Sequence, residues 1–129
     1  MNKIIVEVSI GELLDKISIL EIKQEKIKDP EKIKFINNEY LILKNQLNEN
    51  VKNDDKLNEL FKSLKKINEK LWVIEDDKRQ CEKDKDFSEK FIKLSRDVHF
   101  LNDDRAKIKL EINNHTGSTI KEIKEYTNY

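Results

Sequence analysis

Residues 54–83 read DDKLNELFKSLKKINEKLWVIEDDKRQCEK, and this stretch decides the fold. Its seam positions, spaced alternately by three and four residues, are Leu57, Leu60, Leu64, Ile67, Leu71, Ile74, Lys78 and Cys81. A heptad of this length is typical of an α-helix that packs side by side with another helix. We therefore predict a helix over residues 54–83, roughly 45 Å long at about 1.5 Å per residue.

A second long helix is predicted over residues 86–115. Its seam, after the short polar break at Lys83–Asp86, is Phe87, Phe91, Leu94, Val98, Leu101, Arg105, Ile108 and Ile112. Asp86 and Glu89 have the spacing of a capping box, which favours a helix start here. Gly117 suits the left-handed position just past a helix end, so residues 116–129 are expected to form a tail.

The N-terminal part of the chain predicts two shorter helices. Ser9 and Glu12 have capping-box spacing before an apolar stripe, which indicates a helix over residues 9–28. Asp29 and Pro30 are suited to the N-cap and the first turn of the next helix, over residues 30–50. The β-branched run over residues 3–8 predicts a short strand.

These elements predict a single all-α domain over residues 1–129, built from antiparallel helical hairpins in a bundle or coiled-coil-like arrangement. A four-helix bundle is one outcome. Because the second hairpin is longer than the first, a homodimer that covers the extra apolar length is the other. The strand also needs a partner, which is either the tail over 119–126 or the same strand of a second subunit.

Composition narrows the function classes. Lys+Arg and Asp+Glu are balanced at 26 each, and they balance again within residues 1–52 and 53–129, so we expect neither nucleic-acid nor membrane binding. The chain has no long apolar run and no signal-peptide pattern. The single cysteine, Cys81, fits a reducing compartment, so we expect a cytoplasmic protein.

Catalytic and cofactor motifs are missing from the sequence. There is no glycine-rich phosphate loop, no CxxC pair, no HExxH and no nucleophile elbow, and the chain has only two glycines. The one-turn pairs His99/Asp103 and Glu111/His115 have metal-ligand spacing, but we interpret them as surface or capping residues. We therefore expect no cofactor and no metal, and a non-enzyme rather than an enzyme.

Arginine is the most informative polar residue. Only three of the 26 basic residues are arginine, namely Arg79, Arg96 and Arg105. Arginine is preferred where a planar, bidentate, always-charged donor is needed. An antiparallel hairpin places Arg96 opposite Glu75, and Arg105 at the level of residues 65–69.

Two interpretations of these arginines remain open. In the first, they form interhelical ion pairs with carboxylates and fix the register of the helices. In the second, they line a pocket for an anionic or sugar-like ligand, with Trp72 as an apolar wall. The candidate ligand-binding residues are Trp72, Glu75, Asp76, Arg79, Arg96, Asn102, Asp103 and Arg105.

Four segments resemble a family of small uncharacterised proteins of bacteria and their phages, described only as a domain of unknown function. They are VEVSIGELLDKISILEIK (6–23), LWVIEDDKR (71–79), NDDRAKIKLEIN (102–113) and TGSTIKEIKEY (116–126). The resemblance spans nearly the whole chain. It implies no activity, cofactor or catalytic residue, although its segments contain most of the candidate residues.

The leading functional hypothesis is a non-catalytic helical module that self-associates as a homodimer and holds a protein partner. The alternative is a small-molecule binding protein or enzyme with a polar site between the two long helices. The first hypothesis predicts a dimer in solution. The second predicts that Arg96 and Arg105 converge on a cavity instead of pairing with carboxylates.

Overall fold

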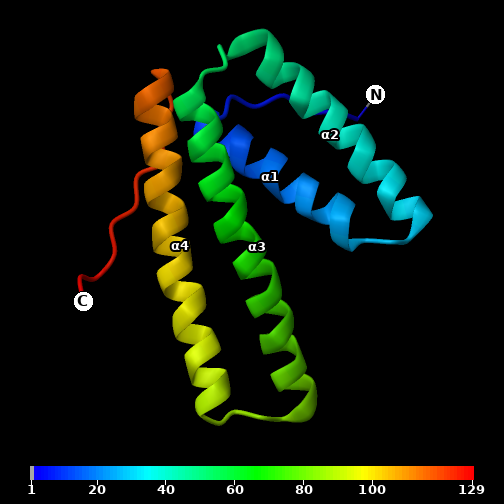
Figure 1. Ribbon diagram of the computed structural model, residues 1–129, viewed down its shortest axis with the longest axis vertical. Helices are drawn as coiled ribbons and strands as arrows, with labels where there is room; N and C mark the ends of the chain where they lie inside the picture. Colours follow the sequence, from blue (N-terminus) through cyan, green and yellow to red (C-terminus); the bar gives the residue numbers. More distant parts are fainter. Residues whose placement is uncertain (1) are drawn as a thin grey trace.

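The computed structural model describes residues 2–129, so Met1 of the predicted domain lies outside the described residues. Its helices are α1 (Ile10–Lys26), α2 (Pro30–Asn50), α3 (Asp55–Asp84) and α4 (Glu89–Thr116). Figure 1 shows two hairpins, α1–α2 and α3–α4, that meet at the upper end of the molecule. Helix α1 packs against the other three helices, whereas the backbone of α2 lies close to that of α1 alone within residues 2–129. The predicted all-α fold of antiparallel hairpins is confirmed.

Local capping signals set most helix ends. Ser9 accepts a hydrogen bond from the backbone N–H of Glu12 at 3.0 Å, and Asp29 accepts one from Glu31 at 3.0 Å, with Pro30 in the first turn of α2. Asp54 caps α3 through the N–H of Leu57 at 2.8 Å. Each bond satisfies a backbone donor that the helix itself leaves unpaired.

The turn between α3 and α4 departs from the expected capping box. Helix α4 begins at Glu89 with Ser88 as its N-cap, and Asp86 accepts a bond from the Ser88 backbone N–H at 3.1 Å. Lys85 ends α3 in the left-handed conformation with φ 54°, and Gly117 ends α4 with φ 70°. The predicted capping box at Asp86 and Glu89 is therefore wrong. Residues 86–88 belong to the turn that follows the left-handed Lys85, so α4 begins later than expected.

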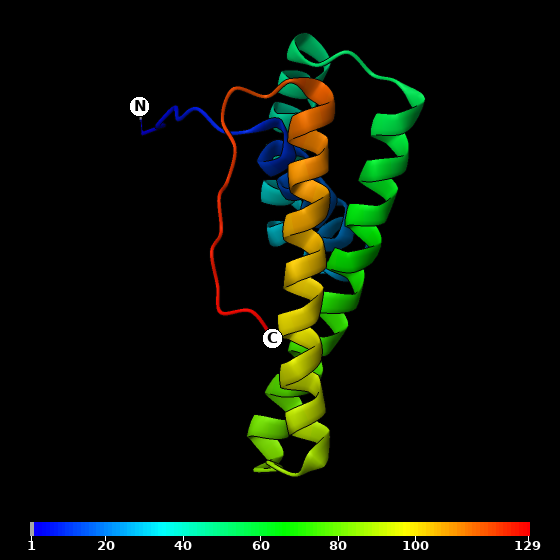
Figure 2. The ribbon, with the colours of Figure 1, turned by 90° about the vertical axis from the view of Figure 1, so that its left-hand side faces the viewer.

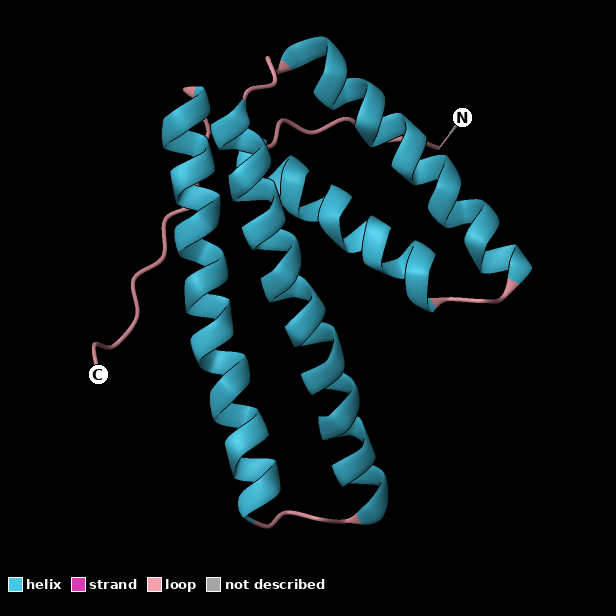
Figure 3. Cartoon of the chain, viewed as in Figure 1, coloured by secondary structure: helices cyan, strands magenta, loops and turns pink. Residues whose placement is uncertain are grey.

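The predicted strand over residues 3–8 is wrong. Figure 3 draws this segment as loop, and Ile4 and Ile5 are 90% and 84% exposed. A strand needs a neighbouring backbone. The tail after Gly117 does not supply one, because it also lacks regular structure and runs back beside α4, as Figure 2 shows. The β-branched run alone therefore does not form a strand in this chain.

The apolar core lies where α1 crosses the upper halves of α3 and α4. Its central cluster consists of Leu14, Leu57, Leu60, Leu64 and Ile112. Beyond the end of α1, the lower halves of α3 and α4 contact no other helix within the described residues (Figure 1). The long hairpin therefore projects from the core with much of its length uncovered.

Across residues 2–129, no helix combines the length and apolar character needed to cross a membrane.

Candidate functional site

The structure brings five of the eight predicted site residues to one cavity. This cavity, here called the Trp72 cavity, has a volume of about 340 Å³ and lies between α1, α3 and α4. The predicted residues that line it are Trp72, Glu75, Asp76, Arg79 and Arg105. Four of them share one face of α3 because they are spaced by one or two helical turns. The rest of the wall is Ile19, Ile22, Asn68 and Leu71.

The other three predicted residues lie elsewhere. Arg96 lies over the ring of Phe100, with its guanidinium carbon 5.7 Å from the ring centroid, and within residues 2–129 it makes no ion pair with Glu75. Asp103 accepts a hydrogen bond from the hydroxyl of Tyr129 in the tail. Asn102 Oδ1 is 3.5 Å from Arg105 Nη1, at the limit of hydrogen bonding. Arg96 and Arg105 thus do not converge on one cavity.

Arg105 is held by a carboxylate from α1. Asp15 is only 2% exposed, and it accepts two bonds from the guanidinium: Nε to Oδ1 at 2.9 Å and Nη2 to Oδ2 at 2.5 Å. This bidentate geometry matches the planar fork of arginine. A buried carboxylate is stable only when paired and hydrogen-bonded. The pair therefore fixes where α1 crosses α4.

Asn68 of α3 joins the same group. Its Nδ2 donates to Asp15 Oδ1 at 2.9 Å and to Ser18 Oγ at 2.8 Å, while the Ser18 hydroxyl donates to the backbone oxygen of Asp15 at 2.7 Å. We call Asp15, Ser18, Asn68 and Arg105 the polar core. Within residues 2–129, every buried side-chain nitrogen and oxygen has a hydrogen-bond partner. The polar core therefore links α1, α3 and α4 through a continuous network of hydrogen bonds.

Burial and hydrogen bonding act in opposite directions on Asp15. Desolvation raises the pKa of its carboxyl, but the hydrogen bonds from Arg105 and Asn68 and the positive charge of Arg105 outweigh it, so the pKa lies below the ordinary 3.8. The charged form is thus favoured in the folded protein. A group with a lowered folded pKa stabilises the fold above its unfolded pKa and loses that contribution as the pH falls through the folded pKa.

We therefore expect the free energy of unfolding to fall as the pH drops below about 4. In the Asp15→Asn variant this part of the pH dependence should be missing, so the curve of stability against pH should be shallower there. Urea unfolding at a series of pH values measures both curves. Asp104→Asn, at an exposed carboxyl on α4, is the control and should keep the wild-type slope. Parallel curves for wild type and Asp15→Asn would contradict the prediction.

A second group of charges, centred on the buried Lys109, lies one turn further along α4. Lys109 Nζ donates to Glu12 Oε2 at 2.7 Å and to Glu122 Oε2 of the tail at 3.0 Å. Desolvation lowers the pKa of Lys109, but these two carboxylates outweigh it and raise the pKa above its ordinary value. The Glu12 carboxylate thus reaches α4 and does not complete the capping box with Ser9. The pair of Lys109 with Glu122 holds the tail beside α4.

Gly11 lets α1 approach α4 closely. Its N–H donates to Asn113 Oδ1 at 2.7 Å, and a Cβ built on it would be 2.6 Å from the backbone oxygen of Lys109. Only glycine allows a backbone contact this close. The N–H of Ile10 donates to Ser118 Oγ at 3.2 Å, so side chains at the end of α4 cap the first turn of α1.

Sequence reasoning missed Asp15, Ser18, Lys109 and Asn113. Asp15 does interrupt the apolar run from Leu13 to Ile22, and a charge inside such a run was the available signal. Gly11 was a second signal, because a glycine in the first turn of a helix is costly unless another backbone comes close. Both signals mark α1, whereas the predicted site was assigned to α3 and α4.

The two histidines make structural contacts. His115 Nε2 lies 2.9 Å from Asp54 Oδ2, at the N-cap of α3, and His99 stacks near Tyr129 with ring centroids 4.8 Å apart. Within residues 2–129, no group of three or more histidine, cysteine or acidic side chains is placed to hold a metal ion.

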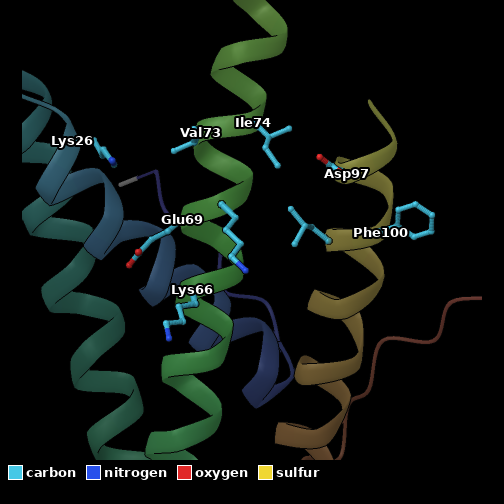
Figure 4. Close-up of a pocket in the computed structure, with 9 residues that line it drawn as sticks. Lys26, Lys66, Glu69, Val73, Ile74, Asp97 and Phe100 are labelled. Carbon is cyan, nitrogen blue, oxygen red and sulfur yellow. The ribbon is translucent and has the colours of Figure 1, made fainter. Parts of the chain in front are cut away.

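A larger cavity lies on another face of α3. It is open to solvent, has a volume of about 800 Å³ and lies between α3, α4 and the end of α1. Figure 4 shows Val73 and Ile74 on α3, Asp97 and Phe100 on α4, and Lys26 at the end of α1. We call this surface the hairpin groove, and it is lined by Lys26, Lys66, Glu69, Lys70, Val73, Ile74, Asp97, Phe100 and Leu101. It combines an apolar centre with charged residues of both signs.

Comparison with known proteins identifies a family whose function is not known. Residues 4–129 match the profile of a protein family described as "Family of unknown function (DUF6165)". No curated protein and no solved structure matches the chain. The match covers all four residues of the polar core as well as the residues that line the Trp72 cavity and the hairpin groove. The chain therefore belongs to this family of unknown function.

Proposed function

We propose that the protein is a non-catalytic helical module that self-associates as a homodimer and presents the joined long hairpins to a protein partner. The observation that carries the proposal is the uncovered length of the α3–α4 hairpin (Figure 1). Helix α3 has 30 residues and α4 has 28, whereas α1 has 17 and crosses only their upper halves. Helices with apolar length left uncovered gain stability by packing against another copy.

The hairpin groove has the composition of a self-complementary interface. Its centre is apolar, and Val73 there is 49% exposed, so a partner would remove this surface from water. Its charged residues have both signs, with Lys66, Glu69 and Lys70 on α3 and Asp97 on α4. A two-fold axis brings the same patch of two copies together, which lets positive residues of one copy meet negative residues of the other. The geometry therefore supports a symmetric dimer across the groove.

The proposed module belongs in the cytoplasm. Cys81 is the only cysteine in the chain, and it is free and buried within α3. A fold without disulfides is suited to a reducing compartment. The Cys81 thiol then acts as a small apolar core group.

Val73→Glu is expected to abolish the dimer. The substitution places a charge at the centre of the apolar groove, where a second copy would have to desolvate it. Light scattering coupled to size exclusion, over a range of concentrations, should give the mass of a dimer for the wild type and of a monomer for Val73→Glu.

Phe35→Glu is the matched control. Phe35 lies on α2, away from the groove, and is 74% exposed, so the same kind of change should leave the dimer intact. A wild type that stays monomeric at every concentration would refute the proposal. Dissociation by Phe35→Glu together with an unaffected Val73→Glu dimer would instead move the interface to α2.

A further inference from the structure

The Trp72 cavity has the size and walls of a small-molecule site. Its volume of about 340 Å³ falls within the range of roughly 300–1,000 Å³ seen for ligand pockets. One side is apolar, formed by Ile19, Ile22 and Leu71, and Trp72 adds a large flat surface. Its residues lie on a different face of α3 from those of the hairpin groove, because the two sets alternate along the helix. The cavity and the hairpin groove therefore share no lining residue.

Asn68 supplies an acceptor of fixed orientation in the wall of the cavity. The side chain is 5% exposed, and its Nδ2 donates both to the Asp15 carboxylate and to the Ser18 hydroxyl. The Ser18 proton is already used toward the Asp15 backbone oxygen, so the orientation of the amide is set. Within residues 2–129 the amide oxygen receives no side-chain donor, and Asn68 lines the cavity. The amide oxygen of Asn68 can therefore accept a hydrogen bond from a ligand in the cavity.

The charges at the cavity do not favour an anion. The Arg105 guanidinium is matched by Asp15, so its charge is already neutralised. Among the other charged lining residues, the acidic Glu75 and Asp76 outnumber Arg79, and within residues 2–129 none of these three makes an ion pair. An anionic ligand would meet more negative than positive free charge. Binding of an anionic ligand by the arginines, which the sequence left open, is therefore disfavoured at this cavity.

We propose that the Trp72 cavity binds a neutral polyhydroxylated ring, that is, a monosaccharide or one sugar unit of a glycan. The apolar C–H face of such a ring packs against Trp72, and its hydroxyl groups donate to Asn68 Oδ1 and to the Glu75 and Asp76 carboxylates. Arg79 donates to a ring or hydroxyl oxygen. One flat apolar face combined with several donors in the plane of a ring distinguishes a sugar from a purely apolar ligand or a phosphate.

Trp72 provides the measurement, because it is the only tryptophan in the chain. The purified full chain is titrated with glucose, galactose, mannose and N-acetylglucosamine up to about 100 mM, a range that covers weak affinities. Inorganic phosphate and methylammonium are titrated in parallel as anionic and cationic probes. We expect at least one neutral sugar to give a saturable change in Trp72 fluorescence, and saturation-transfer NMR on the same sugar to detect the contact. Neither charged probe should saturate.

Asp76→Asn and Asp77→Asn form the matched pair of variants. Both residues are exposed neighbours on α3, but only Asp76 lines the cavity. Asp76→Asn should weaken sugar binding about tenfold or more, because hydrogen bonds to a charged acceptor are stronger than those to a neutral one. Asp77→Asn should bind as the wild type does. Circular dichroism checks that both variants stay folded.

Three results would overturn the proposal. The first is the absence of any sugar signal in both fluorescence and NMR. The second is saturable binding of phosphate or methylammonium without binding of a sugar. The third is equal weakening by Asp76→Asn and Asp77→Asn, which would place the sugar outside the cavity. None of these depends on whether the protein dimerises, so the proposal stands or falls separately from the proposed function.

Discussion

Arg105→Met should lower the free energy of unfolding by about 3–5 kcal/mol, which is the usual cost of removing one partner from a buried ion pair. The substitution keeps the apolar stem of the side chain but removes the fork that neutralises Asp15. The Asp15 carboxylate, only 2% exposed, is then left with the Asn68 amide as its remaining side-chain donor. Small domains are stable by about 5–15 kcal/mol, so the loss is a large share of the total. Urea or thermal unfolding measures it.

Two further variants test this explanation. Arg96→Met removes an arginine from the same helix that only stacks over Phe100, so it should cost about 1 kcal/mol or less. Adding Asp15→Asn to Arg105→Met should recover part of the stability, because the buried group is then neutral. A loss of less than about 1 kcal/mol for Arg105→Met would show that water reaches Asp15 and that the pair does not hold the fold.

Gly11→Ala should destabilise the protein by about 1–3 kcal/mol, although alanine is the better helix former by about 1 kcal/mol. The added Cβ would lie 2.6 Å from the backbone oxygen of Lys109 and 2.9 Å from Asn113 Oδ1. The first atom belongs to a helix backbone and cannot turn away, so α1 and α4 must separate. Separation also stretches the 2.7 Å bond between the Gly11 N–H and Asn113.

Lys16→Ala is the control for this experiment, because Lys16 is exposed on the same helix. It should change the free energy of unfolding by no more than about 0.5 kcal/mol. Chemical unfolding of both variants under the same conditions gives the comparison. An increase in stability for Gly11→Ala would mean that helix propensity outweighs the contact and that α1 is free to shift away from α4.

The helices could be predicted because their signals are local. The caps at Ser9 and Asp29 and the glycine after Thr116 act within one turn of chain, and the heptad of residues 54–83 identifies the face that packs. The strand could not be predicted in the same way. A β-branched run shows what a strand would look like, but a strand exists only where another backbone lies beside it, and no local pattern supplies that information.

The part of the candidate site that lies on one helix could be predicted, whereas its contacts with α1 could not. Trp72, Glu75, Asp76 and Arg79 lie within eight residues of one helix, so their common face follows from helical spacing alone. That Arg105 joins them depends on the packing of α3 against α4, which the heptads also indicate. Asp15 was missed because it lies 90 residues away in the chain, and periodicity does not encode where α1 crosses the other helices.

Helix α1 is synthesised before the other three helices, but two of its hydrogen bonds join it to α4, which is synthesised last of the four. Of the four helices α1 leaves the ribosome first, yet the hydrogen bonds that Arg105 donates to Asp15 and that Gly11 donates to Asn113 span 90 and 102 residues. At about 5–20 residues per second, the Asp15 carboxylate waits roughly 5–20 s for its arginine. During that interval α1 can pair with α2 and α3, and the Asn68 amide can reach Asp15, but the bidentate partner of this carboxylate is still missing. The nascent chain completes its interior only when synthesis of α4 is nearly finished.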